Sequence, residues 1–249
     1  MTNVCVAGIT GWTGSAIARG VQKADDLELV SGVARSGAGD FDVPVRAAIE
    51  AALEGVDVLV EFTSHEAAKR HTLAALERGI AVVIGASGLT AEDFEEIAAA
   101  ATGAGVIASG NFSLTAAMMQ AGAIMAARHL PSWEVIDYAS ATKPDVPSGT
   151  ARELAEKLGA SQLGRPIDEI HGPREARGAD VAGTRVHSVR LPSFVVSTEV
   201  VFGLPDERLT IRHDAGGTPE PYVAGALLAV RRAVGLKGLV RGLDSLLVS

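Results

Sequence analysis

The sequence predicts an α/β fold, in which a doubly wound parallel sheet is interrupted by a smaller α+β region. The first half alternates short β-branched runs with segments of helical spacing, which is typical of parallel strands joined by helices. After Pro131 the strands follow one another through short connections, which is typical of antiparallel pairing. The last helical segment, 220–235, is expected to rejoin the first sheet.

The first half is expected to contain five buried strands, most of them followed directly by a helix. Thr90 is a good N-cap for the helix that it opens. The expected strands are 3–10, 27–34, 56–62, 80–87 and 106–112, and the expected helices are 14–24, 65–79, 90–105 and 113–130. The inserted region is expected to hold strands 133–140, 183–192, 193–203 and 207–215 and a helix over 148–159.

The composition indicates a globular chain with an ample core. Of the 249 residues, 47% are hydrophobic and 21% are charged, so disorder is not expected. The net charge of −8 is spread along the chain, which argues against a nucleic acid or an anionic membrane as partner. Cys5, the single cysteine, is expected to be a buried strand residue. The chain shows no membrane-spanning run and no signal-peptide pattern, so a cytoplasmic location is expected.

A glycine-rich turn follows the first strand, in "GITGWTG". Gly8 allows a tight turn, Gly11 lets a pyrophosphate approach the backbone, and Gly14 lets the helix pack on the strand. The pattern favours dinucleotide binding, and the alternative is a glycine-rich turn that binds nothing. The candidate cofactor residues of this turn are Gly8, Thr10, Gly11, Trp12, Thr13 and Gly14.

The end of the second strand bears on the choice of cofactor. A carboxylate there would bind the ribose 2′-hydroxyl of NAD, but this chain has Arg35 and Ser36 instead. The planar fork of arginine matches phosphate oxygens, so NADPH is favoured, with NADH still possible. The alternative is a solvated loop arginine.

Two further turns, "GASG" at 85–88 and "GNFS" at 110–113, follow expected parallel strands. Open α/β sheets bind ligands at the carboxyl ends of their strands, although each stretch could also be a plain turn.

Lys143 precedes two prolines and the stretch Ser148, Gly149 and Thr150, which opens a helix. The lysine can neutralise a carboxylate and donate a proton, and the N–H groups and hydroxyls of the stretch can bind a carboxylate. The alternative is a capped helix preceded by a surface lysine.

The six histidines form no metal set. His65 and His71 lie six residues apart on one helix, which is not ligand spacing. His129 and His171 are expected to be solvated, and His187 either lies in a pocket or is a satisfied sheet histidine.

The stretch "KPDVPSGTA" resembles the K-x-D-A-P-S-G-T-A signature of the dihydrodipicolinate reductase family, also called 4-hydroxy-tetrahydrodipicolinate reductases. The resemblance runs along the whole chain. "GITGWTG" stands at the place of the family's glycine-rich loop, and "VEFTSHEA", "VIGASG", "GNFS" and "GTRVHSVR" resemble further family segments in the same order.

The resemblance implies a Rossmann-type dinucleotide-binding domain over 1–113 and 215–249, and a substrate-binding and oligomerisation domain over 114–214. It implies a homotetramer, a nicotinamide cofactor and hydride transfer to a cyclic imine dicarboxylate on the route to lysine and diaminopimelate. The family's lysine falls on Lys143, and its carboxylate-binding pair falls on Gly149 and Thr150. The remaining candidate cofactor residues are Phe62, Thr63, Gly85, Ala86, Ser87, Gly110, Asn111 and Phe112.

Three departures from the family pattern concern the substrate side. Ala139 and Ser140 stand where the family has a histidine pair, and "GGTPEP" lacks the arginine that the family carries there. The third is "SFVVSTEV", where the family has Gly-Asp-x-x-Gly-Glu-His. The candidates for the missing proton donor are Asp137, Tyr138 and Thr142, and those for the missing cation are Arg190 and Arg212.

The leading interpretation is an NADPH-dependent reductase of this family that acts on a C=N bond of a small, cyclic, carboxylated substrate, with altered specificity. One alternative is the authentic lysine-pathway enzyme with an unusual acid. A second is a non-catalytic NADPH-binding sensor, against which Lys143 and its neighbouring anion site argue.

Overall fold

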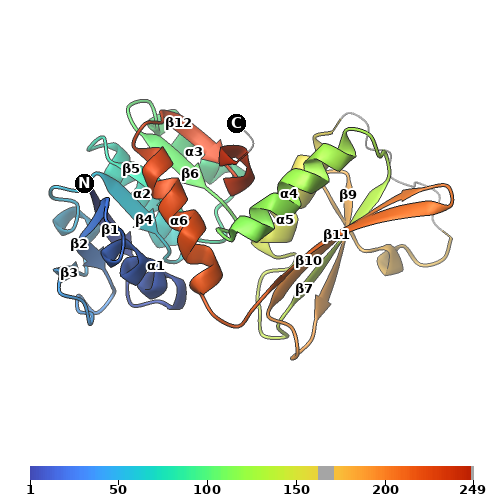
Figure 1. Ribbon diagram of the computed structural model, residues 1–249, viewed down its shortest axis with the longest axis horizontal. Helices are drawn as coiled ribbons and strands as arrows, with labels where there is room; N and C mark the ends of the chain where they lie inside the picture. The colour runs from blue at the N-terminus through green and yellow to red at the C-terminus, as the bar shows by residue number, and fades with distance from the viewer. Residues whose placement is uncertain (162–170, 248–249) are drawn as a thin grey trace. The chain divides into compact units, whose positions relative to one another are not determined.

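The computed structural model describes residues 1–161 and 171–247. The chain divides into two compact units. One consists of Met1–Leu114 and Thr218–Leu247, and the other, Thr115–Gly217, is inserted between these two segments. Each unit has a sheet of its own (Figure 1). The predicted fold class, a parallel α/β sheet with an inserted α+β region, is confirmed.

Among the described residues, the first unit has a seven-stranded sheet in the order β12-β6-β5-β4-β1-β2-β3. All its pairings are parallel. Two short strands, β3 and β12, were not expected, because neither lies within an unbroken apolar run of the kind that marks the buried strands. The strands are β1 (Thr2–Ala7), β2 (Leu27–Val33), β3 (Val45–Arg46), β4 (Val58–Glu61), β5 (Ala81–Ile84), β6 (Gly105–Ala108) and β12 (Gly238–Arg241).

Helices cover both faces of this sheet. The helices α1 (Trp12–Gln22) and α6 (Glu220–Ala233) pack together on one face, so the last helix rejoins the first sheet as expected (Figure 1). On the other face lie α2 (His65–Leu76) and α3 (Ala91–Ala100), with the short 3-10 turn η1 (Ile49–Ala51) beside them. Thr90 caps α3 through a reciprocal pair of hydrogen bonds with Asp93.

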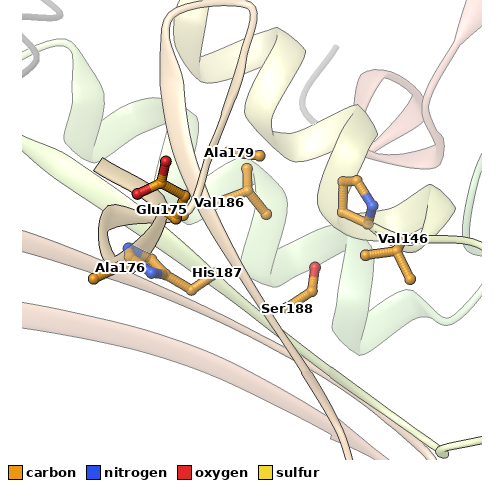
Figure 2. Close-up of a pocket in the computed structure, with 9 residues that line it drawn as sticks. Val146, Glu175, Ala176, Ala179, Val186, His187 and Ser188 are labelled. Carbon is orange, nitrogen blue, oxygen red and sulfur yellow. The ribbon is translucent and has the colours of Figure 1, made fainter. Parts of the chain in front are cut away.

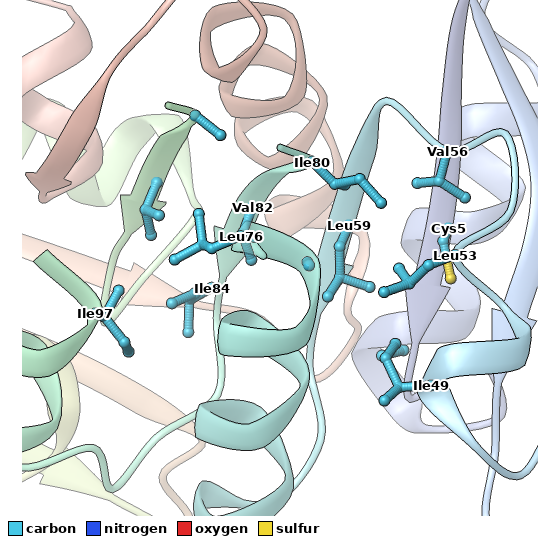
Figure 3. Close-up of a cluster of buried hydrophobic side chains, with 14 of the residues drawn as sticks. Cys5, Ile49, Leu53, Val56, Leu59, Leu76, Ile80, Val82, Ile84 and Ile97 are labelled. Carbon is cyan, nitrogen blue, oxygen red and sulfur yellow. The ribbon is translucent and has the colours of Figure 1, made fainter. Parts of the chain in front are cut away.

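The core beneath α2 and α3 is a continuous cluster of buried aliphatic side chains (Figure 3). Alternate residues of a strand face opposite sides of a sheet, so Cys5, Leu59 and Val82 share this face. Ile97 of α3 and Leu76 of α2 pack onto them. Because the strands are buried on both faces, they read as nearly unbroken apolar runs in the sequence.

The described part of the second unit has a five-stranded sheet in the order β11-β10-β7-β9-β8. The expected antiparallel pattern is only partly correct, because β7 and β9 pair in parallel. The crossover between these two strands contains α5, and a connection of that length permits parallel pairing. The strands are β7 (Trp133–Ala139), β8 (Ala179–Val181), β9 (Thr184–Arg190), β10 (Val196–Leu204) and β11 (Glu207–Ala215).

Two helices, α4 (Leu114–Ala127) and α5 (Gly149–Gly159), supply the apolar side chains that cover one face of the second sheet. Val135, Val200 and Phe202 of the sheet pack there against Met119 and Leu154. In the described ranges, no helix is both long and apolar enough to cross a membrane. Two further 3-10 turns are η2 (Arg174–Arg177) and η3 (Leu243–Leu246).

Candidate cofactor and substrate sites

The turn after β1 is built so tightly that Gly8 and Gly14 are sterically required. Gly8 has a positive φ of 82°, and a Cβ atom there would lie 2.5 Å from the carbonyl oxygen of Phe62. A Cβ atom at Gly14 would lie 2.1 Å from the carbonyl oxygen of Gly8. Gly11 donates its N–H to the same oxygen at 2.8 Å and stands at the N-cap of α1. The turn therefore presents bare backbone and a helix N-terminus, which fits the pyrophosphate of a dinucleotide.

The ends of β4, β5 and β6 meet around one aromatic side chain. A Cβ atom at Gly85 would lie 2.1 Å from the Phe62 ring, so only glycine leaves room for that ring. Phe62 also contacts Phe112, with 5.6 Å between ring centroids. Gly8, Phe62, Gly85 and Phe112 are thus brought together at the carboxyl edge of the sheet, where open α/β sheets bind their ligands.

The residues beside this cluster differ in exposure. Asn111 is buried, and its Oδ1 accepts the N–H of Ser113 at 2.8 Å, whereas Ser87 and Gly110 are exposed. Ala86 and Thr63 are half-buried. Trp12 is 54% exposed and meets the Tyr222 ring edge to face, with centroids 6.0 Å apart. Tyr222 lies on the first turn of α6, and no local sequence pattern connects it with the glycine-rich turn.

Arg35 and Ser36 follow β2 and are exposed. The Ser36 hydroxyl donates to the carbonyl oxygen of Ala38 at 2.9 Å, within a turn that Gly37 closes. Within residues 1–161 and 171–247, Arg35 forms no ion pair, so its guanidinium is available to an anion from solution.

In the second unit, the carboxylate of Asp145 contacts two of the predicted substrate-site residues, Lys143 and Gly149. The Lys143 Nζ is 2.7 Å from Oδ1 of Asp145, and the Gly149 N–H donates to Oδ2 of the same carboxylate at 3.3 Å. Burial alone would raise the pKa of Asp145, but the hydrogen bond from Lys143 and its charge lower the pKa below its usual value. Asp145 was not singled out from the sequence, although it lies within the quoted signature.

Ser148 has another role in the structure. It caps α5 by accepting the Ala151 N–H, and it directs its own donors into the protein. Its N–H and its hydroxyl donate to the two oxygens of Asp137 at 2.9 and 2.7 Å. The donors that face Asp145 are therefore those of Gly149 and Lys143, while Thr150 is buried in the first turn of the helix.

Asp137 is fully buried on β7 and forms an ion pair with Arg190 at 2.7 Å. Arg190 also donates to the carbonyl oxygens of Asp137 and Asp145, and the Ser188 hydroxyl lies 3.3 Å from the Asp137 carboxylate. The oxygens of the Asp137 carboxylate already accept hydrogen bonds from several donors, and Arg190 already serves as its counter-ion. Neither residue is available in this arrangement to replace the missing acid or cation.

The candidates Tyr138 and Arg212 lie on the opposite face of the sheet from Asp137, because neighbouring strand residues alternate. The Arg212 guanidinium stacks on the Tyr138 ring at 4.9 Å and pairs with Asp214 and Glu199. The idea that these two residues serve the Lys143 side is therefore wrong. Thr142 does lie on the turn before Lys143, with its hydroxyl 3.0 Å from that of Ser140.

Three of the six histidines contact carboxylates, two are exposed, and His213 is buried on β11. His187 pairs with Glu134 at 2.8 Å and also lines a hollow of about 500 Å³ with Val146, Pro147 and Ser188, so both readings of this residue apply (Figure 2). His129 and His171 are exposed. His71 pairs with the buried Glu61, a contact that sequence reasoning missed. The described residues contain no group of three side chains able to hold a metal ion.

The parallel sheet with its glycine turn, joined to a second unit with a cation beside a helix N-terminus, defines a two-unit oxidoreductase of the Rossmann type. The family models for the N-terminus and the C-terminus of dihydrodipicolinate reductase match residues 2–112 and 113–247. The chain therefore belongs to the dihydrodipicolinate reductase family, whose members are NAD(P)H-dependent oxidoreductases acting on C=N bonds.

Relatives of high coverage agree with this family. The 4-hydroxy-tetrahydrodipicolinate reductase of Nocardia farcinica is 39% identical, with 98% of each chain covered. That of Halalkalibacterium halodurans is 36% identical, with 99% of this chain and all of the relative covered. A solved structure of dipicolinate-bound dihydrodipicolinate reductase from Paenisporosarcina sp. TG-14 has 27% identity and a TM-score of 0.80, covering 98% of this chain and 99% of that one.

Proposed function

We propose that the protein reduces the C=N bond of a small cyclic imine that carries a carboxylate, with the first unit binding NADPH and the second binding the substrate. The observation that carries the proposal is the Asp145 carboxylate, which bridges the Lys143 ammonium and the Gly149 N–H. A site that accepts a carboxylate of the chain in this manner has the donors that a substrate carboxylate requires.

The bound nicotinamide cofactor supplies the hydride. Gly8, Gly11 and Gly14 leave the backbone bare for its pyrophosphate. In the second unit, Lys143 neutralises the substrate carboxylate and donates a proton toward the reduced nitrogen, while Gly149 and Thr150 bind the same carboxylate. Ser148 contributes indirectly, because its hydrogen bonds to Asp137 fix the start of α5.

Turnover measurements on a Lys143→Ala variant test this proposal. The variant is expected to bind NADPH as before and to lose about a hundredfold or more in turnover, the scale of a positioned proton donor. Lys157→Ala is the matched control, because Lys157 pairs with Glu153 further along α5. Loss of cofactor binding in the Lys143 variant would mean that the lysine binds the cofactor and not the substrate, which would contradict the proposal.

NADPH is the proposed cofactor because Arg35 is exposed and forms no ion pair within the described ranges. One charge-assisted phosphate contact contributes about 1.5–3 kcal/mol, so Arg35→Ala is expected to remove most of the preference over NADH. Arg78→Ala, which removes an arginine bonded to the Glu50 carbonyl, is the control. Equal affinities of the unaltered protein for NADPH and NADH would refute this assignment.

Altered substrate specificity is the finer part of the proposal. A second carboxylate in a closed site needs its own donors, because an unpaired buried charge is costly. Arg190 is bound to Asp137, and Arg212 lies on the other face of its sheet. We therefore expect an imine with one carboxylate to be reduced better than hydroxy-tetrahydrodipicolinate, as followed by loss of NADPH absorbance.

The authentic lysine-pathway activity is the second candidate, and the nearly complete coverage of the curated reductases supports it. Efficient turnover of hydroxy-tetrahydrodipicolinate would establish that candidate and refute altered specificity. Cofactor binding with no turnover of any imine would favour the third candidate, an NADPH-binding sensor.

A homotetramer assembled through the second sheet is also part of the proposal. The face of that sheet opposite α4 and α5 carries Ile136, Tyr138, Val189 and Val201, which are half-buried in the single chain. Apolar side chains of this kind beside charged ones, here Arg212 and Glu199, are typical of a face that packs against another protein chain. Light scattering coupled to size exclusion would give the mass, and a monomer would refute this part.

A further inference from the structure

A buried carboxylate lies at the end of the central strand β4, next to the Phe62–Thr63 turn. Glu61 is fully buried between β1 and β5, where it pairs with Ala7 and Ile84. The other three residues of β4 are apolar. A carboxylate in such a place is tolerated only where hydrogen-bond donors surround it, because burial without them is costly.

Glu61 has three donors, and two of them come from one residue. The Thr63 N–H donates to Oε1 at 2.7 Å, and the Thr63 hydroxyl donates to the same oxygen. His71 of α2 approaches the other oxygen, with 2.7 Å between Nδ1 and Oε2. The carboxylate therefore joins the turn after β4 to a helix that packs on the sheet.

The partners of the two ring nitrogens of His71 favour the tautomer with its proton on Nδ1. Nδ1 lies 2.7 Å from Oε2 of Glu61, an acceptor, and Nε2 lies 3.4 Å from Nη2 of Arg70, which can only donate. The proton on Nδ1 then points at Glu61. Since His71 is itself buried, its ring has little freedom to leave this position.

The turn anchored by Glu61 is the one around which the cofactor residues gather. Phe62 fills the space left by Gly85, its carbonyl oxygen abuts Gly8, and its ring contacts Phe112. A displacement of Thr63 would move Phe62 and with it the walls contributed by β1, β5 and β6. Two hydrogen bonds from Thr63 to Glu61 restrain this turn, and the contact with His71 ties the same carboxylate to α2.

We propose that Glu61 and His71 are positioning residues, which hold the Phe62–Thr63 turn in the conformation that binds the dinucleotide. The inference rests on the proposed function, since it assumes that the turn contacts a nicotinamide cofactor. His71 orients the Glu61 carboxylate, and the carboxylate in turn fixes Thr63 by both its N–H and its hydroxyl. Neither side chain touches the reacting atoms in this scheme.

The test compares His71→Leu with His71→Asn, whose side-chain amide can donate from nearly the same place as Nδ1. We expect His71→Leu to weaken NADPH binding about tenfold by calorimetry, the scale of one hydrogen bond to a charged group. His71→Asn should restore the affinity to within about threefold of the unaltered protein. Turnover at saturating NADPH should change far less than the KM for NADPH in either variant.

A second readout needs no cofactor. In the free protein, exchange of the Thr63 amide hydrogen should be faster in His71→Leu than in the unaltered protein, and slow again in His71→Asn. Leu76→Ala, a cavity variant of the same helix that leaves Glu61 untouched, controls for general loss of stability. If the unaltered protein binds neither NADPH nor NADH, the proposed function fails, while the Thr63 exchange still tests the positioning role.

Two results would overturn the inference. One is an NADPH affinity and a Thr63 exchange rate in His71→Leu that both equal those of the unaltered protein. The other is an equal loss of affinity in His71→Leu, His71→Asn and Leu76→Ala, because the effect would then follow stability and not the donor at Nδ1.

Discussion

Removal of the Asp137 side chain is expected to destabilise the second unit severely. In Asp137→Ala, four donors lose their acceptor: the Arg190 guanidinium, the Ser148 N–H, the Ser148 hydroxyl and the Ser188 hydroxyl. Ser188 is exposed, so water can replace its partner. Ser148 is only 2% exposed and the Arg190 side chain only 15%, so their donors remain largely buried.

The size of the loss in free energy of unfolding depends on which of these donors remain inaccessible to water. Breaking a buried ion pair by removing one partner costs about 3–5 kcal/mol, because an uncompensated charge is left behind. Partial exposure of Arg190 moves the estimate toward the lower end, and the orphaned Ser148 N–H at the start of α5 adds about 1–3 kcal/mol. The lower ends of these two ranges add up to about 4 kcal/mol, and this is the fall in the free energy of unfolding that we expect.

Urea unfolding followed by Trp133 fluorescence measures this loss within the second unit. The chain has two tryptophans, so a Trp12→Phe background leaves Trp133, which packs on Phe202, as the single reporter. Asp214→Asn, which breaks an exposed pair with Arg212, is the control and should cost no more than about 1 kcal/mol. A loss below about 1 kcal/mol in Asp137→Ala would refute the reasoning, since Arg190 would then be hydrated and not buried as a counter-ion.

Two further predictions concern titration and reactivity. Burial lowers the pKa of His213, outweighing the opposite effect of Asp214, so the folded state favours neutral His213. The free energy of unfolding should therefore fall as the pH drops through about 6.5, and His213→Gln should flatten that slope in denaturation curves; an unchanged slope would contradict the assignment. Burial also raises the pKa of the Cys5 thiol to about 12. Native protein should therefore resist a thiol-reactive disulfide reagent at pH 8, and one thiol should react after unfolding; rapid reaction of the native chain would refute burial of Cys5.

The sequence was most informative where local chemistry determines local structure. Buried parallel strands read as apolar runs, so β1, β4, β5 and β6 were predicted from pattern alone. The pairing of β7 with β9 could not be predicted, because partner choice depends on long-range packing and not on the pattern within either strand. The glycines of the first turn were the part of the site that the sequence predicted best, because the close approach of the backbone there leaves no room for a side chain.

Side-chain partners across the chain were the least readable part. Arg190 lies 53 residues from Asp137, and nothing local to either residue indicates the pair. The sequence makes Tyr138 a candidate acid because it lies close to Lys143, but the alternation of β7 turns it away from Asp137 and Ala139. Knowledge of which face α5 covers would have excluded it, and that face is set by tertiary packing.

The two units share one structural feature at turns that contain predicted site residues. In each, a fully buried carboxylate on a sheet strand accepts both the N–H and the hydroxyl of one predicted site residue: Glu61 does so for Thr63, and Asp137 for Ser148. Each carboxylate has a basic partner on a second element, His71 in one case and Arg190 in the other.

A turn held through its backbone N–H cannot move without breaking a charge-assisted hydrogen bond in a low-dielectric interior, which is more costly than breaking a solvated one. Glu61 interrupts an otherwise apolar strand, which makes it readable from the sequence, whereas β7 also carries Glu134, so the sequence alone does not single out Asp137. We therefore expect the conservative changes Glu61→Gln and Asp137→Asn to weaken ligand binding through the adjacent turn, as measured by the NADPH affinity of the first variant and the KM for the imine of the second, and unchanged values in both would contradict this reasoning.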